Sequence, residues 1–424
     1  MNEKRDLLLL LIAALIATGL IVREGKVLIL AIPPLVYFLT GLLQAPTQIA
    51  LHAERLLSRN SISVHDPVGV RIRVENVGAA LVNLRLQDEP ITSLEPVSGR
   101  MDKLLSLPVG GAAEFEYVIK PERGAYSWES IRAWIADPLD LFFRQRAIAA
   151  PGELLVRPPL IKIRPVSVGI RSTKLSAGPI PARRAGTGTD YWGIREYTPG
   201  DSLRRLNWRL AARYPGNWYT NEFEREEIAD FGLILDTRRL SNADRKERFL
   251  FEHATSAAAS IAEMALKNGN RVSLLLFGQS MRSLFPGFGK QQLNRVLENL
   301  GRAQLADYVP FSFLKYFPVR LFPARAQIII LSTLDRRDLE GYARLRSFGY
   351  DVLLISPDPV EYAFRTLPAS ARGELAYRAA RVERILLLER LVDMGVKVAN
   401  WRVDMPLDPI LHESMKIRLP ARRL

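Results

Sequence analysis

The sequence predicts three parts: a helical hairpin that spans a membrane, an antiparallel β-sandwich, and an α/β domain with a mostly parallel sheet. Two uncharged apolar runs come first, at residues 7–22 and 27–43. Alternating apolar and polar residues follow, and continuously apolar strands separated by helical segments come last. The predicted boundaries are 1–45 for the hairpin, 46–60 for a linker, 61–160 for the sandwich, 161–229 for a segment packed on the α/β domain, and 230–424 for that domain.

The composition is that of a globular protein with a basic surface. Of the 424 residues, 48% are apolar, and the formal net charge is +14. The basic residues are interspersed and no recognisable nucleic-acid module is present, so we expect no nucleic-acid partner. The chain has no cysteine, which excludes disulfides, cysteine nucleophiles and thiolate metal sites. Four histidines, none at ligand spacing from another, are expected to be surface or packing residues: His52, His65, His253 and His412.

The two apolar runs predict a transmembrane hairpin anchored in the cell membrane. A spanning helix usually needs about 20 residues, with about 17 as the lower limit. Pro33 and Pro34 are expected to kink the second helix. A signal peptide is the alternative, but the second run and the lack of a small-residue cleavage site argue against it. By the positive-inside rule, Lys4, Arg5, Arg55 and Arg59, against Arg23 and Lys26 in the tip, place the soluble parts in the cytoplasm.

Residues 61–158 have the period of two that is typical of half-buried strands. Strands are expected near 68–75, 80–86 and 113–119, with turn chemistry between them. Several short strands without helices indicate an antiparallel sandwich of immunoglobulin-like layout. Nothing here resembles an active site, so we interpret this part as a spacer or binding module.

The stretch from Gly186 to Arg213 is the most distinctive of the chain. Gly186 and Gly188 permit positive φ or close backbone approach. Such a turn can cradle a phosphate, but no nucleotide-binding pattern accompanies it, so a flexible turn is favoured. Pro199 and Gly200 form a corner, and Asp201 is expected to cap the helix that follows.

The predicted helix after Asp201 carries a stripe of arginines. Leu203, Leu206 and Leu210 share one face, whereas Arg205, Arg209 and Arg213 follow at intervals of four residues. Two interpretations remain open for this stripe. It pairs internally with Glu222, Glu224, Glu226 and Glu227 on a strand from Trp218, or it docks an acidic partner.

Strands and helices alternate after residue 230. Strands are expected at 231–236, 271–277, 327–331, 351–355 and 396–401, with helices near 243–266, 291–300, 339–348 and 374–394 and a Phe/Gly-rich loop after 277. This order indicates a parallel sheet covered on both faces. Ligands of such sheets bind beyond the carboxyl ends of the strands, where this chain carries Asp236, Gly278, Asp335 and Asp358.

Fourteen positions between Gly186 and Arg213 resemble the signature of the family called domain of unknown function number fifty-eight. The resemblance extends over nearly the whole chain, including the corners Arg123-Gly-Ala-Tyr126 and Asp137-Pro-Leu139. It implies a membrane hairpin, a β-sandwich and a von Willebrand factor A-like (Rossmann-like) domain. The matching positions are Gly186, Gly188, Asp190, Tyr191, Arg195, Tyr197, Pro199, Gly200, Asp201, Arg204, Asn207, Trp208, Ala212 and Arg213.

The resemblance also implies a magnesium site that this chain lacks in sequence. Von Willebrand-like domains hold Mg²⁺ through an Asp-x-Ser-x-Ser motif after the first strand, because Mg²⁺ prefers hard oxygen ligands. Here the motif is degenerate: it begins at Asp236, and Arg238 and Leu240 replace the serines. Asp335 is a candidate for a later acidic position of the site. We expect no metal and no cofactor.

The expected function is that of a membrane-anchored, non-enzymatic interaction or adaptor protein. The resemblance implies a MoxR-type AAA+ ATPase as its partner in the assembly or maturation of other proteins. One alternative is a hydrolase or transferase that uses carboxylates such as Asp190, Glu196 or Asp201. The other is a membrane protein whose arginines bind anionic lipid or another polyanion.

Overall fold

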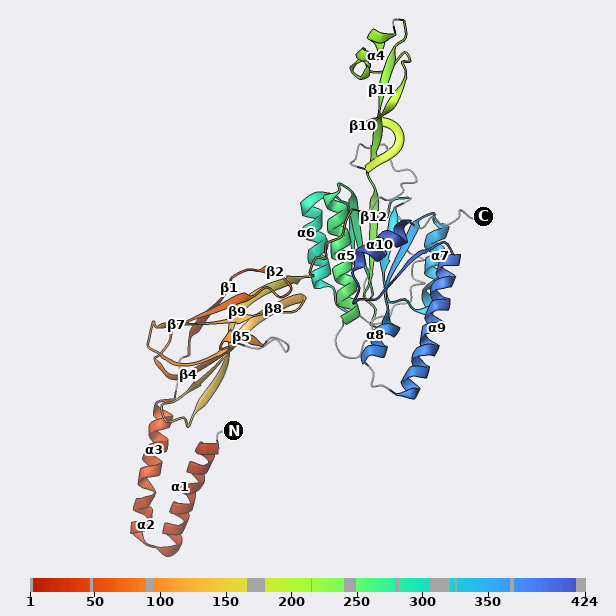
Figure 1. The fold of residues 1–424 in the computed structure, drawn as a ribbon. Helices are drawn as coiled ribbons and strands as arrows, with labels where there is room; N and C mark the ends of the chain where they lie inside the picture. The colour runs from red at the N-terminus through yellow and green to blue at the C-terminus, as the bar shows by residue number, and fades with distance from the viewer. Residues whose placement is uncertain are drawn as a thin grey trace. The chain divides into compact units, whose positions relative to one another are not determined.

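Figure 1 shows the fold in a computed structural model of the chain. The structure describes residues 3–45, 49–88, 95–165, 180–214, 216–239, 249–278, 282–305, 321–324, 326–366 and 370–416. They fall into two compact units, Met1–Arg157 and Pro158–Leu424.

The first unit begins with two apolar helical segments. Helix α1 (Glu3–Val22) is followed by α2 (Gly25–Leu30) and α3 (Ile32–Leu43). The stretches Glu3–Val22 and Gly25–Leu43 are each long and apolar enough to span a membrane, and most of their side chains are exposed. Pro33 and Pro34 lie in the first turn of α3, directly after the interruption at Ala31 that separates α2 from α3.

Two sheets follow in the same unit. One has the strand order β1-β3-β7-β5 and the other β2-β9-β8-β4-β6, and all their pairs are antiparallel except β2 with β9. Strand β1 lies inside the predicted linker 46–60, so the sandwich begins earlier than expected. The strands are β1 (Leu51–Leu57), β2 (Ser61–Ser63), β3 (Val68–Asn76), β4 (Leu81–Asp88), β5 (Pro96–Gly99), β6 (Asp102–Leu107), β7 (Ala112–Ile119), β8 (Gly124–Ala136) and β9 (Phe143–Arg157).

A buried polar cluster lies within the sandwich core. The side chains of Arg55 and Asp88 are fully buried and form an ion pair, and Arg55 also donates to the carbonyl of Ala150. The Tyr117 hydroxyl donates to Asp88 Oδ2 at 2.5 Å. Burial and then the Asp88 charge raise the pKa of Tyr117, which stays a neutral donor. Arg55 therefore ties β1 to the core, although it was counted among the residues that flank the membrane spans.

Removing one member of this pair should destabilise the sandwich strongly. Asp88→Ala leaves the Arg55 guanidinium buried without its counter-charge, which we expect to cost about 3–5 kcal/mol of unfolding free energy. Asp102→Ala is the matched control, because its pair with Arg85 at 3.2 Å is exposed and should contribute less than about 1 kcal/mol. Urea unfolding of the detergent-solubilised chain measures both, and equal losses would contradict the assignment.

The second unit contains a six-stranded sheet with the order β14-β13-β12-β15-β16-β17. All neighbours are parallel except β13 and β14. This agrees with the predicted mostly parallel sheet, but β14 forms an edge strand where the sequence predicted only a loop. The strands are β12 (Asp230–Asp236), β13 (Arg271–Phe277), β14 (Arg282–Gly287), β15 (Gln327–Leu331), β16 (Asp351–Pro357) and β17 (Lys397–Trp401).

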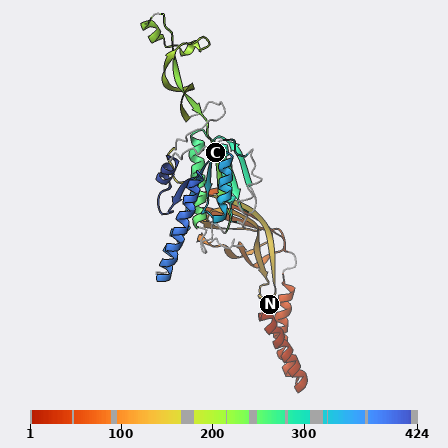
Figure 2. The same cartoon turned by 90° about the vertical axis from the view of Figure 1, so that its right-hand side faces the viewer.

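Helices cover both faces of this sheet (Figures 1 and 2). Leu233 and Leu235 of β12 join one buried cluster with α5 and α6, whereas Ile234 joins another with α7 and α9. This alternation explains why the strands are apolar throughout. Helices α8 and α10 were not predicted. The helices are α5 (Phe249–Lys267), α6 (Gly289–Arg302), α7 (Leu339–Ser347), α8 (Pro359–Thr366), α9 (Ala371–Asp393) and α10 (Leu407–Lys416).

Strands β10 (Ile180–Glu196) and β11 (Tyr219–Glu227) form a separate two-stranded antiparallel sheet (Figure 1). We call residues 180–227 the arm, and residues 195–222 its tip. The tip contains the short segments η1 (Leu203–Arg205) and α4 (Trp208–Arg213).

Candidate functional site

The glycines at the start of the signature lie in a strand. Gly186 and Gly188 belong to β10, where Gly186 pairs with Phe223 of β11. Tyr191 also pairs with Phe223, so the residues between them form an irregularity in the strand. In the register of β10 with β11, residues 187–190 have no partner on β11, so the predicted turn coincides with a break in the pairing inside β10. The side chain of Asp190 lies outside the described residues.

The proline-glycine corner is held by a forked ion pair. Arg195 Nη1 and Nη2 donate to the two carboxylate oxygens of Asp201, each at 2.7 Å, and Arg195 Nε donates to Glu222 Oε1 at 2.9 Å. Asp201 also accepts from the Thr198 amide at 3.0 Å. Gly200 has a φ of +111°, a conformation that favours glycine. Arg195, followed by Thr198, holds the pKa of Asp201 well below its usual range.

Asp201 thus closes the corner and does not cap a helix as predicted. Such a bidentate pair with arginine fixes the orientation of both side chains. Because Asp201 remains ionised and is engaged by Arg195, it is a poor general acid. Glu196 is exposed beside this corner, on the last position of β10.

Asn207 interrupts the predicted arginine-striped helix. Its backbone N–H donates to the Tyr219 carbonyl at 2.8 Å, and its side-chain amide donates to Asn221 Oδ1 at 2.8 Å. Asn207 Oδ1 accepts from the Leu210 amide at 3.1 Å and so caps α4. The neighbouring Leu206 is buried and forms a bridge with Thr220. The expected single helix is therefore wrong, because pairing with β11 pulls these residues out of helical geometry.

Only two arginines of the predicted stripe share a helix. Arg209 and Arg213 lie four residues apart on α4 and are exposed. Arg205 lies on η1 and is half-buried, and the exposed Arg204 precedes it. The partner of Glu222 is Arg195 and not a member of the stripe. The side chains of Glu224, Glu226 and Glu227 lie outside the described residues.

Aromatic side chains accompany these arginines at the tip. Trp208 and Trp218 are 64% and 51% exposed, and their ring centroids lie 6.5 Å apart. Tyr197 contacts Trp218 with a centroid distance of 5.9 Å, and its amide donates to the Trp218 carbonyl at 2.8 Å. An open hollow of about 510 Å³ lies here. Its lining residues are Glu196, Tyr197, Pro199, Gly216, Asn217 and Trp218.

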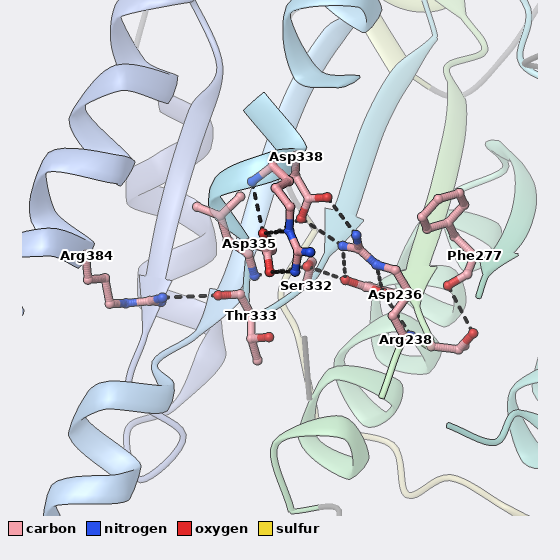
Figure 3. Close-up of polar contacts among 11 residues, drawn as sticks. Asp236, Arg238, Phe277, Ser332, Thr333, Asp335, Asp338 and Arg384 are labelled. Atoms are coloured by element: carbon pink, nitrogen blue, oxygen red, sulfur yellow. Dashed lines mark hydrogen bonds and ion pairs between the residues drawn. The ribbon is translucent and has the colours of Figure 1, made fainter. Parts of the chain in front are cut away.

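A second polar cluster lies at the carboxyl end of β12 (Figure 3). Arg238 is fully buried between Asp236 and Asp338. Its Nη2 lies 2.6 Å from Asp236 Oδ2 and 2.8 Å from Asp338 Oδ2, and its Nη1 lies 2.7 Å from Asp338 Oδ1. The Ser332 hydroxyl donates to Asp236 Oδ2 at 2.6 Å. The guanidinium is thus the cation that both carboxylates bind.

Asp335, the candidate for a later acidic position, does not join this cluster. Asp335 instead pairs with Arg337, whose hydrogen bond is the main cause that lowers the pKa of Asp335 to about 2. Asp338 reaches Arg238 because the short 3₁₀ turn that begins after Asp335 directs it inward. Leu240 lies outside the described residues. Within the described ranges, no group of three His, Asp or Glu side chains is placed to hold a metal ion.

The pKa values of Arg238 and Asp338 shift according to their neighbours. Burial alone would lower the pKa of Arg238, but its hydrogen bonds to Asp236 and Asp338 raise it above its usual value. Burial raises the pKa of Asp338, although Arg238 opposes that change. The three side chains form a buried ion triad, in which the charge of Arg238 compensates the charges of Asp236 and Asp338.

Arg238→Met should expose this dependence. Two buried carboxylates would lose their cation, which we expect to cost about 3–5 kcal/mol of unfolding free energy. Without Arg238, the main opposition to the effect of burial, which raises the pKa of Asp338, is lost. The variant should therefore lose stability relative to the native chain as the pH rises from about 5 to about 8. Urea unfolding at both pH values measures this. Arg302→Met, which removes an exposed pair with Glu298, should change little, and a pH-independent loss would contradict the triad.

The chain is similar to proteins that are themselves named uncharacterized. Uncharacterized protein YeaD of Bacillus subtilis (strain 168) is 32% identical over 120 residues, which are 28% of each chain. Uncharacterized protein Rv1480 of Mycobacterium tuberculosis is 26% identical over 257 residues, 52% of this chain and 76% of that relative.

The solved CARDB domain of the PF1109 protein from Pyrococcus furiosus has a TM-score of 0.20 and 14% identity, covering 26% of this chain and 94% of that one. The family model described as "Protein of unknown function DUF58" matches residues 193–355 of this chain, from the distal part of β10 through most of β16.

Proposed function

We propose that the chain is a membrane-anchored, non-enzymatic adaptor whose arm tip docks an acidic surface of a partner protein. The observation that carries this proposal is the exposure of arginines and tryptophans together at the tip. Arg209 and Arg213 of α4 are exposed, as are Trp208 and Trp218. Arginine and tryptophan are the side chains that most often dominate binding energy at protein interfaces.

The way the tip is built supports this proposal. Arg195, Asp201, Asn207 and Glu222 satisfy one another or nearby backbone groups. They hold the backbone of the tip, so the exposed residues are presented on a structure that is already ordered. Preorganisation of this kind reduces the entropy lost on binding. The partner that the resemblance implies is a MoxR-type AAA+ ATPase, acting in assembly or maturation of other proteins.

The α/β domain fits the same proposal as a von Willebrand factor A-like scaffold without metal-dependent adhesion. Arg238 fills the position at which such a domain would bind a cation, and it belongs to the chain itself. Its pairing with Asp236 and Asp338 leaves their carboxylates engaged. Binding through a shared metal ion is therefore not part of the proposed mechanism.

A cytoplasmic location of the arm completes the proposal. The excess of basic residues that supports this orientation is smaller than the sequence suggested, because one of the four flanking residues, Arg55, is buried with Asp88. Lys4, Arg5 and Arg59 remain near the ends of the spans, against Arg23 and Lys26 at the turn. A fluorescent or enzymatic reporter fused after residue 424, active only in the cytoplasm, tests the orientation directly.

Charge reversal at the tip tests the docking. The full chain, solubilised from membranes in detergent, should recover an AAA+ ATPase in a pull-down, and Arg209→Glu with Arg213→Glu should reduce that recovery at least about tenfold. The matched control is Arg282→Glu with Arg295→Glu, which reverses two exposed arginines of β14 and α6. It makes the same change in net charge away from the arm.

Two outcomes would overturn the proposal. If both double variants recover the ATPase as well as the native chain does, the arginines of α4 are not the docking residues. If the tip variant loses binding to vesicles that contain anionic lipid but keeps the ATPase, the tip is a lipid-binding surface instead. Unchanged unfolding by urea in both variants excludes a folding defect as the cause.

A further inference from the structure

Helix α9 exposes an apolar stripe along one face. Leu375, Val382 and Leu386 are 71%, 58% and 52% exposed. Their spacings of seven and four residues put them on one face of the helix. Ile385 and Val392 lie beside this stripe and are also exposed. Figure 1 shows α9 as a long helix at the border of the α/β unit.

The opposite face attaches α9 to the domain. Among the residues of α9, only Arg384 and Leu391 are buried, and they lie seven positions apart. Arg384 forms an ion pair with Asp358 at 3.2 Å and donates to Asn400 Oδ1 at 2.7 Å. Leu391 joins the buried cluster that contains Ile234 of β12. Since these contacts fix the rotation of the helix, the stripe cannot turn inward.

Contiguous apolar patches rimmed by charged residues commonly mark contact sites with other molecules. Twenty-three residues of helix extend over about 35 Å, which is long enough to pack along a second helix. The charged residues beside the stripe indicate which kind of partner is complementary to it.

The charges along α9 are arranged in two halves. Arg372, Arg378 and Arg381 outnumber Glu374 in the first half. In the second half, Glu383, Glu389 and Asp393 outnumber Arg390. Arg384 also lies in this half but is buried. A helix with a basic first half and an acidic second half is complementary to an antiparallel copy of itself. An anionic membrane would attract one half and repel the other.

We propose that α9 is a homodimer interface, in which two copies of this chain pack their stripes together in antiparallel orientation with Val382 near the twofold axis. Closed twofold contacts use the same surface on both subunits. In this arrangement Arg378 faces Glu389 of the partner subunit, and Arg372 approaches Asp393 of the partner subunit. The apolar residues supply the buried area, and the charges select the direction of pairing.

The absence of cysteine from the sequence makes this geometry directly testable. Val382→Cys in the full chain, oxidised in membranes, should give a disulfide-linked dimer, because each Val382 lies near its own copy. Leu375→Cys is the matched control: seven residues from the axis, its two copies would lie about 21 Å apart, whereas a disulfide needs Cα atoms within about 7 Å. Mixed protomers with Leu375→Cys and Glu389→Cys should cross-link to each other.

A second variant tests association without cross-linking. Val382→Glu places two like charges at the axis and should raise the dimer dissociation constant at least about tenfold, as measured by light scattering in detergent. The control is Leu104→Glu, which changes a similarly exposed apolar residue on β6. Cross-linking through Leu375→Cys alone would overturn the antiparallel arrangement. An absence of the Val382→Cys dimer, together with no effect of Val382→Glu, would overturn the interface itself.

Discussion

The carboxyl edge of the parallel sheet depends on one buried guanidinium. Asp236 ends β12 and Asp338 lies in the turn before α7, and both carboxylates are removed from water. Burial of two like charges at one place is unfavourable unless a cation compensates them. Arg238 supplies that cation with donors aimed at both groups. Because this cation is covalently part of the loop after β12, it cannot dissociate as a metal ion would.

The same interaction limits what the edge can do. A bound metal with an open position offers coordination to a partner, whereas a guanidinium whose donors are engaged offers none. Arg384 and Asp358 close the neighbouring part of the edge in a similar way, with Arg384 also donating to the carbonyl of Thr333. We therefore expect this chain to recognise partners through exposed surfaces, although the strand ends are the usual site in such folds.

The sequence predicted the elements whose pattern is set locally. Strands β13 and β15 lie at the predicted residues, because buried strands between helices are apolar throughout. Strand β1 was not predicted because it contains Arg55, a residue type expected on the surface. The buried partner of Arg55, Asp88, lies 33 residues further along the chain. The break at Asn207 was missed for the same kind of reason: Tyr219 takes its amide, and helical spacing contains no sign of that pairing.

The sequence indicated which residues belong to the candidate site, but not how they are arranged in it. The signature named Arg195, Asp201 and Asn207, but only the fold distinguishes the residues that build the tip from those that face solvent. The choice between Asp335 and Asp338 also depends on a single short turn, since both are acidic and lie three residues apart. Asp236 and Arg238 stand two residues apart in the sequence, but the second carboxylate that pairs with Arg238, that of Asp338, was found only in the tertiary structure.

The arginines of this chain therefore carry two different roles that net charge cannot separate. Arg55 pairs with Asp88, Arg238 with both Asp236 and Asp338, and Arg384 with Asp358. These three arginines are buried, and their charges are compensated inside the protein. These residues contribute to the formal charge of +14 but little to the field that a partner meets. The positive charge that a partner can meet lies on exposed arginines, such as those of α4 and of the first half of α9. In both of our proposals, the specificity of the surface comes from the position of its exposed arginines, beside tryptophans on α4 and beside an apolar stripe on α9.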